Sequence, residues 1–360
     1  RPKMIRYNVP SVGCELKLER RCPHCHCPNG RIHSNIVHRP ISDPKVCTID
    51  QRRMKCPFCK TTWTIRVEGV ADGRQRTDRL ICIGVVLYVL GLSYRGVEQF
   101  LAMLGCQGSK STVERDVARL GQKANALHTE SLDDVGLEIL GVDGTGARMA
   151  GQRRAGMLFF VDIGSGRLLF VVRANETDSR RVPQHVQRLM QLFGVEHLRA
   201  DELSVYDQAA PEARRTICLA HWLKTKCKRA WDLSRQFRAE GLLYESQMML
   251  DLQRLLHEKR SSPRLPEEIE RMVRRFINCR RGTHWKANQL PQHIERTWEH
   301  VGRGPGEPTN NATERVIGLT YKIRAKTMRG FKSWDKALAH PYLSQYLRGE
   351  NGICDLRMVI

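Results

Sequence analysis

The sequence has no apolar run long enough to cross a membrane. Its longest, LICIGVVLYVLGL at residues 80–92, is well short of the roughly 20 apolar residues that a transmembrane helix needs. This run predicts a buried helix instead. The N-terminal residues also lack the basic, apolar and small-residue segments of a secretory signal. We therefore expect neither a membrane-spanning nor a secreted protein, and we predict a cytoplasmic one.

Acidic residues are scarce relative to basic ones. The 38 Asp and Glu face 60 Lys and Arg, which gives a net charge of +22 and a pI near 9.8. Such an excess attracts polyanions, because phosphates release counterions when cations bind them. It favours a nucleic-acid partner, although ribosomal proteins and proteins of anionic membrane surfaces share this signature. With 360 residues, 41% of them hydrophobic, the chain is long enough for two or three domains.

Cysteine is unevenly distributed, since seven of the 13 lie in the first 59 residues. A disulfide framework is typical of a short secreted domain and does not fit this chain. CPHC at 22–25 and CPFC at 56–59 are paired C-x-x-C turns, and each can offer two thiolates to one tetrahedral zinc ion. Additional donors crowd the first turn (His24, His26, Cys27), so the ligand set stays open. The zinc ligands that we predict are Cys22, Cys25, Cys56 and Cys59.

A helical pattern follows the cysteine-rich segment. Ser93 is a predicted N-cap for YRGVEQFLAML, and Ser111 with Glu114 predicts a capping box for TVERDVARL. Three short helices joined by glycine turns predict a helix-turn-helix, whose last helix would enter a major groove of DNA. A plain helical bundle has a similar pattern. The DNA-contacting residues predicted on the last helix are Arg115 and Arg119.

From residue 137 the periodicity becomes that of strands. LEILGVDGTGARM and AGMLFFVDIGSGRLLFVVRAN predict three strands, with Gly164 and Gly166 in a hairpin turn. An amphipathic helix follows in RRVPQHVQRLMQLFG, and VEHLRADELSVYD predicts a strand that ends in an acid. RRTICLAHWLKTK adds a fifth short strand. Three strands, helix, strand, helix, strand is the order of an RNase H-like α/β domain with a mixed sheet.

Two acids occupy positions that such a sheet brings together. Asp143 lies in the first strand and Asp201 at the end of the fourth, and adjacent strands would place their side chains close to each other. Two nearby carboxylates are stable mainly when divalent cations neutralise them. We predict that Glu314, from a helix packed on the sheet, joins them to hold two Mg²⁺ or Mn²⁺ ions. Such a pair activates an attacking water or 3′-hydroxyl and stabilises the leaving oxygen of a phosphodiester.

Each of these acids also has a simpler local explanation. Glu314 can complete a capping box with Asn311 at a helix N-terminus. Asp143 fits a turn, and Asp201 fits a helix cap. Neighbouring acids compete for the second position of the site. The second choices there are Glu202 and Asp207.

The segment around Glu314 is strongly basic. In PTNNATERVIGLTYKIRAKTMRGFK, residues 308–332, six cations accompany that single acid. Beside a metal site, these cations would hold the phosphates of bound DNA. The DNA-contacting residues predicted here are Lys322, Arg324, Lys326 and Arg329.

These features together resemble a bacterial insertion-sequence transposase of the DDE type, with a zinc-binding module, a helix-turn-helix and an RNase H-like catalytic domain. The matching segments are CPHC...CPFCKTTWT, LGLSYRGVEQFLAMLG...STVERDV, GVDGTGARMAG, LRADELSVYDQA, CLAH and TNNATERVIGLTYKIRAKTMRGFKS. The resemblance implies catalytic roles for Asp143, Asp201 and Glu314. It also implies supporting roles near the site, with ordinary strand packing as the alternative for the C-x-x-H pair. The supporting residues are Cys218, His221, Asn310 and Asn311.

The resemblance also implies a reaction and its partners. The enzyme would bind the terminal inverted repeats of double-stranded element DNA, cleave them with Mg²⁺, and join the 3′ ends to target DNA. At least a homodimer would be needed, since two ends must meet, and the protein would be associated with the bacterial nucleoid. Two other functions remain open: a zinc-containing DNA-binding regulator with an inactive RNase H-like core, and a structure-specific nuclease without strand transfer.

The domain organisation follows from these motifs. Asp201 and Glu314 are 314 − 201 = 113 positions apart, which is more than one strand and one helix require, and the intervening residues have amphipathic helical patterns. We predict a zinc-ribbon-like DNA-binding module at 1–70, a helix-turn-helix at 75–125, and a catalytic domain at 137–348. A helical insertion occupies about 223–303 of the catalytic domain.

Overall fold

The chain divides into two compact units. Unit 1 comprises Arg1–Asp133, Arg148–Gln152 and Leu319–Ile360, and unit 2 comprises Asp134–Ala147 and Arg153–Gly318. The structure is a computed structural model. It describes residues 5–13, 19–65, 67–71, 73–132, 136–150, 155–210, 214–258, 264–277, 283–302, 305, 308–328, 330–349 and 353–360, without the side chains of 155, 266, 273, 275–277 and 283–288.

Unit 1 begins with short strands around a small core. The strands are β1 (Arg6–Asn8), β2 (Arg31–Ile32), β3 (Val37–Pro40), β4 (Thr48–Gln51), β5 (Arg53–Lys55) and β6 (Thr62–Thr64). Strand β5 pairs antiparallel with β2 and β6, and β3 pairs antiparallel with β4. The buried apolar side chains between them are Val12, Ile41, Ile49, Val67 and Val70. A core of this size is typical of a module that needs a metal or another staple for stability.

Helices make up most of the remainder of unit 1. They are α1 (Asp78–Val89), α2 (Tyr94–Met103), α3 (Lys110–Glu130), α10 (Ile323–Thr327) and α11 (Trp334–Tyr346). Helix α1 is a buried helix, as the apolar run predicts, and its side chains pack with those of α2, α3 and α11. Strand β12 (Ile353–Asp355) pairs parallel with β1, and a 3₁₀ turn follows at Leu356–Met358. No helix among the described residues is both long enough and apolar enough to cross a membrane.

The helix starts test the capping predictions. Ser93 is the N-cap of α2 and accepts a hydrogen bond from the Gly96 N–H at 3.0 Å, which confirms that prediction. The prediction of a capping box between Ser111 and Glu114 is wrong. Helix α3 begins two residues earlier, because Ser109 is its N-cap and accepts a hydrogen bond from the Thr112 N–H. The Glu114 carboxylate instead pairs with Lys336 of α11.

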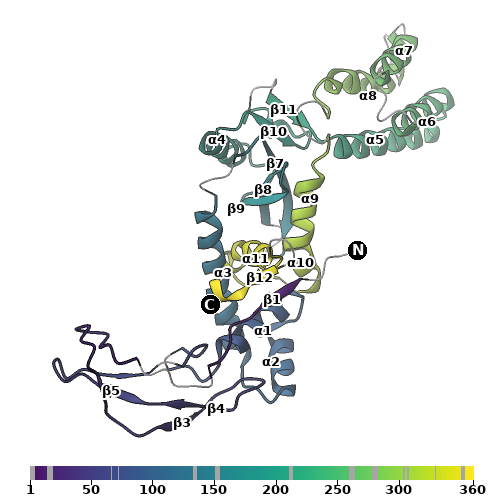
Figure 1. Cartoon of the computed structure of the whole chain (residues 1–360). Helices are drawn as coiled ribbons and strands as arrows, with labels where there is room; N and C mark the ends of the chain where they lie inside the picture. Colours follow the sequence, from purple (N-terminus) through teal and green to yellow (C-terminus); the bar gives the residue numbers. More distant parts are fainter. Residues whose placement is uncertain are drawn as a thin grey trace. The chain divides into compact units, whose positions relative to one another are not determined.

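Unit 2 contains a mixed sheet (Figure 1). Its strands are β7 (Ile139–Ala147), β8 (Ala155–Asp162), β9 (Arg167–Arg173), β10 (His197–Ala200) and β11 (Arg215–Ile217). In the described part of the chain their order is β11-β10-β7-β8-β9, with β7, β8 and β9 antiparallel and the other two parallel to β7. The predicted hairpin turn is confirmed between β8 and β9, where Asp162 accepts from the Gly164 N–H and Gly166 has a φ of 69°.

Helices flank this sheet and extend unit 2. Helix α4 (Arg181–Phe193) precedes β10, and a 3₁₀ turn, Ser204–Tyr206, follows β10. The region of the expected insertion is helical: α5 (Leu219–Ala239), α6 (Leu243–Glu258), α7 (Leu265–Ile277) and α8 (Thr283–Trp298). A shared apolar core holds these helices together, with Trp222 against Trp298 at a centroid distance of 5.4 Å.

Helix α9 (Asn311–Ile317) contacts β7 and β8 and continues into a π-helical turn, Gly318–Lys322. The capping prediction is wrong here by one residue, since the N-cap is Asn310 and not Asn311. The Asn310 side chain is fully buried and donates to the Val142 carbonyl at 2.9 Å. It also accepts from the Thr313 hydroxyl at 2.5 Å. A tertiary contact with β7 therefore fixes the start of α9.

Candidate functional site

The register of two parallel strands brings Asp143 and Asp201 together. Arg199 of β10 is level with Gly141 of β7. Moving two residues along both strands (199 + 2 and 141 + 2) sets Asp201 opposite Asp143, with side chains on the same face, because strand side chains alternate. Asp143 is only 7% exposed. The two carboxylates that the sequence singles out thus lie in one cluster.

A third carboxylate, Glu176, completes this cluster. Carboxylate oxygens of Asp143, Glu176 and Asp201 all lie within 4.8 Å of one another. Glu176 follows β9, and its Oε1 accepts a hydrogen bond from the Tyr206 hydroxyl at 2.9 Å. A Cβ at Gly144 would lie 2.6 Å from Glu176 Oε2. Only glycine beside Asp143 leaves room for this approach.

The sequence interpretation missed Glu176. It lies in the loop segment RANETDS, where neither a hydrophobic period nor a motif marks it. The one available signal was its position directly after the third strand, which runs parallel to the strand that carries Asp143. We name Asp143, Glu176 and Asp201 the carboxylate cluster.

Glu314 reaches the carboxylate cluster through a histidine. His221 Nδ1 lies 2.5 Å from Asp201 Oδ1, and His221 Nε2 lies 2.7 Å from Glu314 Oε1. The two ring nitrogens thus link an acid at the end of β10 with an acid in the first turn of α9. Glu314 lies on the same side of the sheet as the cluster, although its closest charged neighbour is the imidazole.

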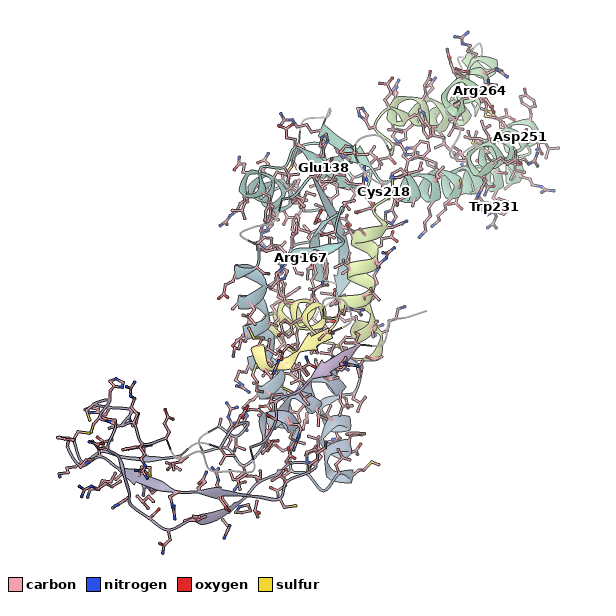
Figure 2. All side chains as sticks on the ribbon, in the orientation of Figure 1. Glu138, Arg167, Cys218, Trp231, Asp251 and Arg264 are labelled. Atoms are coloured by element: carbon pink, nitrogen blue, oxygen red, sulfur yellow. The ribbon has the colours of Figure 1, made fainter. Side chains whose placement is uncertain are left out.

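Cys218 and Asn310 hold this linkage in position. Cys218 lies at the N-terminal end of α5, one turn before His221, and is labelled in Figure 2. Its Sγ accepts a hydrogen bond from the Asn310 backbone N–H at 3.1 Å. Because Asn310 also binds the carbonyl of Val142, next to Asp143, one chain of contacts joins α5, α9 and β7. Asn311 is exposed in the first turn of α9.

Burial and crowding set the electrostatics of the carboxylate cluster. Burial first, and then the charges of Asp201 and Glu176, raise the pKa of Asp143 to about 7. Burial likewise raises the pKa of Glu176, against the opposing hydrogen bond from Tyr206. The cluster therefore concentrates negative charge at a cost in free energy, which a cation would relieve.

In the C-x-x-H pair, the pKa shifts of both side chains favour the charged form, whereas those of Asp143 and Glu176 favour the neutral form. Contact with the Asp201 carboxylate, followed by contact with Cys218, raises the pKa of His221 to about 11. Burial acts against ionisation of Cys218, but hydrogen bonds from His221 and from backbone N–H groups outweigh it and lower the pKa of the thiol. At neutral pH the imidazole is thus a cation between Asp201 and Glu314.

The two second-choice acids are engaged elsewhere. Glu202 accepts from Lys226 Nζ at 2.6 Å and pairs with His293 Nε2 at 2.8 Å. Asp207 forms an ion pair with Arg215. Of the three acids near the end of β10, Asp201 is the one that belongs to the carboxylate cluster.

The cysteines of the two C-x-x-C turns form a second cluster, in unit 1. The Sγ atoms of Cys22 and Cys59 lie 3.6 Å apart, and those of Cys25 and Cys56 lie 3.5 Å apart. Thiolates around one tetrahedral zinc ion lie about 3.8 Å apart, given Zn–S bonds of about 2.3 Å. The four sulfurs therefore fit a zinc site. Within the described residues, this group does not include Cys27 or the histidines beside it.

The cations predicted to contact DNA differ in exposure. Arg115, Lys322 and Lys326 are exposed, whereas Arg119 is half-buried. Arg324 is buried, donates to the Gly91 and Leu92 carbonyls, and lies 4.1 Å from the Tyr88 ring centroid. Its guanidinium thus serves the packing of unit 1, so we keep the DNA proposal to the exposed lysines of this segment. Arg329 lies outside the described residues.

Comparison with known proteins identifies a family for this chain. A protein-family model described as Transposase IS66 family matches residues 78–333. No curated protein matches the chain. The matched span exceeds two thirds of the 360 residues and includes all the residues of the carboxylate cluster together with Cys218, His221 and Glu314. The chain therefore belongs to the IS66 family of transposases.

Proposed function

We propose that this transposase binds the terminal inverted repeats of its element, cleaves phosphodiester bonds there, and joins the freed 3′ ends to target DNA. The observation that carries the proposal is the convergence of Asp143, Glu176 and Asp201, whose carboxylate oxygens all lie within 4.8 Å of one another. Glu314 lies beside them through His221. Carboxylates gathered from distant parts of the sequence repel one another, and divalent cations between them would offset that repulsion.

We propose an RNase H-like fold for the catalytic domain. The strand order β11-β10-β7-β8-β9, with three antiparallel strands followed by two parallel to the first, supports this assignment. Asp143 in the central strand β7 and Asp201 after its neighbour β10 are the positions where such a domain carries acids. The helices α5 to α8 form the insertion in this proposal, between Asp201 and Glu314.

The donor set suits Mg²⁺ or Mn²⁺. Carboxylate oxygens are the ligands that these hard cations prefer, and a separation of up to 4.8 Å between oxygens spans one or two octahedral ions. Asp143, Glu176 and Asp201 would hold them. Two divalent cations in this place would lower the pKa of an attacking water or 3′-hydroxyl and stabilise the leaving oxygen.

The protein groups around the cations have separate tasks. His221 as a cation would lie between the Asp201 and Glu314 carboxylates and hold the two acids together. The Tyr206 hydroxyl would fix Glu176. Asn310 would hold the start of α9, and with it Glu314, at a constant distance from Asp143. These are positioning roles for the reaction.

DNA binding and assembly complete the proposal. The zinc module, with Cys22, Cys25, Cys56 and Cys59, and the helices α1 to α3 would bind the element ends. The exposed Lys322 and Lys326 would contact phosphates. We propose at least a homodimer on DNA, since two ends must meet in one complex, and a location at the bacterial nucleoid.

Strand transfer with labelled element ends tests the proposal. The substrates are a duplex that carries the terminal inverted repeat of the element that encodes the chain, and the same duplex already cut at the 3′ end. The variants are Asp143→Asn, Asp201→Asn, Glu176→Gln and Glu314→Gln, each with Mg²⁺. We expect loss of cleavage and joining by about 10³-fold or more for both aspartates, while end binding survives.

Glu202→Gln is the matched control, because Glu202 adjoins Asp201 but pairs with Lys226 and His293. It should retain most of the activity. If Glu202→Gln is as inactive as Asp201→Asn, the ligand assignment is wrong. Cleavage of uncut ends without joining of pre-cut ends would identify a nuclease instead, and end binding without uptake of Mn²⁺ in calorimetry would identify a regulator.

A further inference from the structure

A cavity in the described part of unit 1 lies at the start of α3. It has a volume of about 640 Å³. Its walls come from three places in the sequence: residues 73–76 before α1, the turn 107–109 between α2 and α3, and the side of α3 from Thr112 to Arg119. This cavity is separate from both metal-ligand clusters.

The cavity has a positive lining. Among the described residues around it are four arginines, Arg74, Arg76, Arg115 and Arg119, and one acid, Asp116. The acid is already neutralised, since its Oδ2 accepts from Arg76 Nη1 at 2.6 Å and both side chains are largely buried. The other three guanidinium groups give the cavity an excess of positive charge, with Asp78 as the other acid in their surroundings.

Arg119 has the feature that points most directly to an anion. Its Nη2 is buried and has no hydrogen-bond partner among the described residues, while Nη1 of the same guanidinium donates to the Ile360 carbonyl at 3.5 Å. A buried donor without an acceptor costs about 1–3 kcal/mol, and more when it is charged. Burial, and then the charge of Arg74, lower the pKa of Arg119. Arginines that line one cavity and leave a donor unused are stabilised when an anion binds there.

The N-terminus of α3 adds donors to the same cavity. Helix α3 has 21 residues, and the first N–H groups of a helix have no partner within it. The Ser109 hydroxyl accepts a hydrogen bond from the Thr112 N–H. The hydroxyls of Ser109 and Thr112 lie 2.7 Å apart at the cavity wall. Backbone N–H groups, hydroxyls and guanidinium groups are the donors that bind phosphate.

Hydrogen bonds fix the walls relative to one another. The Gln107 N–H donates to Ser42 Oγ at 2.6 Å, and the Ser42 N–H donates to the Gln75 carbonyl at 2.6 Å. The Thr77 hydroxyl, at the N-cap of α1, donates to Asp43 at 2.5 Å. Residues 42 and 43 of the cysteine-containing module thus form hydrogen bonds with the segment before α1 and with the turn before α3. These bonds make the cavity a preformed site.

We propose that this cavity binds a backbone phosphate of duplex DNA and so anchors α3 on the element end. The inference rests on the proposed function, because it supplies one contact of the DNA-binding surface. It changes the role expected of Arg119, which would grip a phosphate at the start of α3 and would not read a base edge. Arg74, on the segment before α1, would hold the same phosphate from the other side. A free phosphate has the same chemistry and is the competing occupant.

The test measures DNA affinity against salt. Fluorescence anisotropy compares the element-end duplex with a scrambled duplex of equal composition, for the wild type, Arg74→Gln and Arg119→Gln. We expect each substitution to weaken binding to both duplexes alike, by about tenfold, and to make the slope of log K against log salt shallower by about one.

Lys123→Gln is the matched control. Lys123 is exposed on the same helix, one turn after Arg119, and does not line the cavity. Lys123→Gln removes the same charge as Arg119→Gln. We expect it to reduce DNA affinity by less than about threefold, which is typical of a peripheral cation. Thermal unfolding of each variant checks the fold. If Arg119→Gln does not fold, Arg74→Gln gives the same readout from a different wall.

Three results would overturn the inference. A loss confined to the element-end duplex, with an unchanged salt slope, would make Arg119 a base-reading residue. No loss on either duplex would exclude a DNA contact. Tight uptake of inorganic phosphate in calorimetry, abolished by Arg119→Gln and unaffected by duplex DNA, would make the cavity a small-anion site. Normal phosphate anchoring in a protein that never cuts or joins DNA would refute the proposed transposition and leave this inference intact.

Discussion

The cysteine cluster of unit 1 and the carboxylate cluster of unit 2 gather metal ligands in opposite ways. Two tight turns supply the cysteines, each with two ligands three positions apart, and the core around them is small. The carboxylates come from β7, the loop after β9, and the end of β10, within a sheet whose strands are deeply buried. A metal at the first site would supply folding energy, whereas the sheet preforms the second site at the expense of stability.

Loss of one thiolate gives the largest effect that this comparison predicts. Cys56→Ser should leave residues 19–65 without stable structure, because structural zinc contributes about 10–16 kcal/mol to the folding of small metal-dependent modules. Unit 2 should be unaffected. Hydrogen exchange with peptides from both units measures the difference. Cys27→Ser is the control, since Cys27 neighbours the cluster but is not one of its ligands, and it should retain zinc and protection. Full protection from hydrogen exchange in zinc-free Cys56→Ser would show that the cysteine cluster, like the carboxylate cluster, is preformed without metal.

Asp143→Asn should stabilise the metal-free protein, whereas Cys56→Ser should destabilise it. The folded pKa of about 7 exceeds the ordinary 3.8, so between these values the folded state holds a proton that the unfolded state has released. The contribution of Asp143 to stability is therefore fully present below about 3.8 and is lost as pH rises through 7. At pH 8 the asparagine variant should be more stable than the wild type by about 2–4 kcal/mol, an upper range for one buried group.

Denaturant unfolding at pH 8 and pH 5, without and with Mg²⁺, measures this effect. The gain from Asp143→Asn should shrink at pH 5, where the wild-type carboxyl is protonated. Added Mg²⁺ should stabilise the wild type and not the variant. A variant that is less stable than the wild type at pH 8 would show that the carboxylate cluster is a source of stability.

The sequence predicts much of unit 2 because its signals there are regular. Alternating apolar residues locate the strands that carry Asp143, and an acid at the end of a short strand marks Asp201. Glu176 carries no such signal. Its side chain reaches the cluster only because the loop after β9 turns back over Gly144, a contact between positions 32 residues apart. Tertiary geometry determines that kind of contact, and no local pattern encodes it.

The basic segment after Glu314 shows a second limit. Charge alone suggests equal roles for Lys322, Arg324 and Lys326, yet Arg324 is buried against carbonyls at the end of α1. The π-helical turn at Gly318–Lys322 changes which side chains share a face, so ordinary helical spacing does not predict the buried one. The predicted cap at Asn311 fails for a related reason, since the side chain of the true N-cap, Asn310, contacts the carbonyl of Val142 in β7 as well as Thr313 of its own helix.

The smallest predicted effect concerns one hydroxyl beside each cluster. Tyr206→Phe removes the hydrogen bond to Glu176. Thr61→Val removes the hydroxyl that lies 3.3 Å from Cys59 Sγ, the first of several groups that together lower the pKa of that thiol to about 5. Such outer partners typically change metal affinity by about 10–100-fold. Calorimetry with Mn²⁺ and competition with a zinc chelator measure the two changes.

The two substitutions should affect the protein differently even if each lowers metal affinity by the same factor. A tenfold loss is about 1.4 kcal/mol, a small part of a zinc site that contributes about 10–16 kcal/mol, so Thr61→Val should remain folded and zinc-loaded. Mg²⁺ keeps much of its hydration and binds proteins weakly, so the same loss at Glu176 should empty the carboxylate cluster at ordinary Mg²⁺ concentrations and reduce cleavage. If Tyr206→Phe leaves Mn²⁺ affinity unchanged, Glu176 is not a ligand, and the cluster must be completed by Glu314.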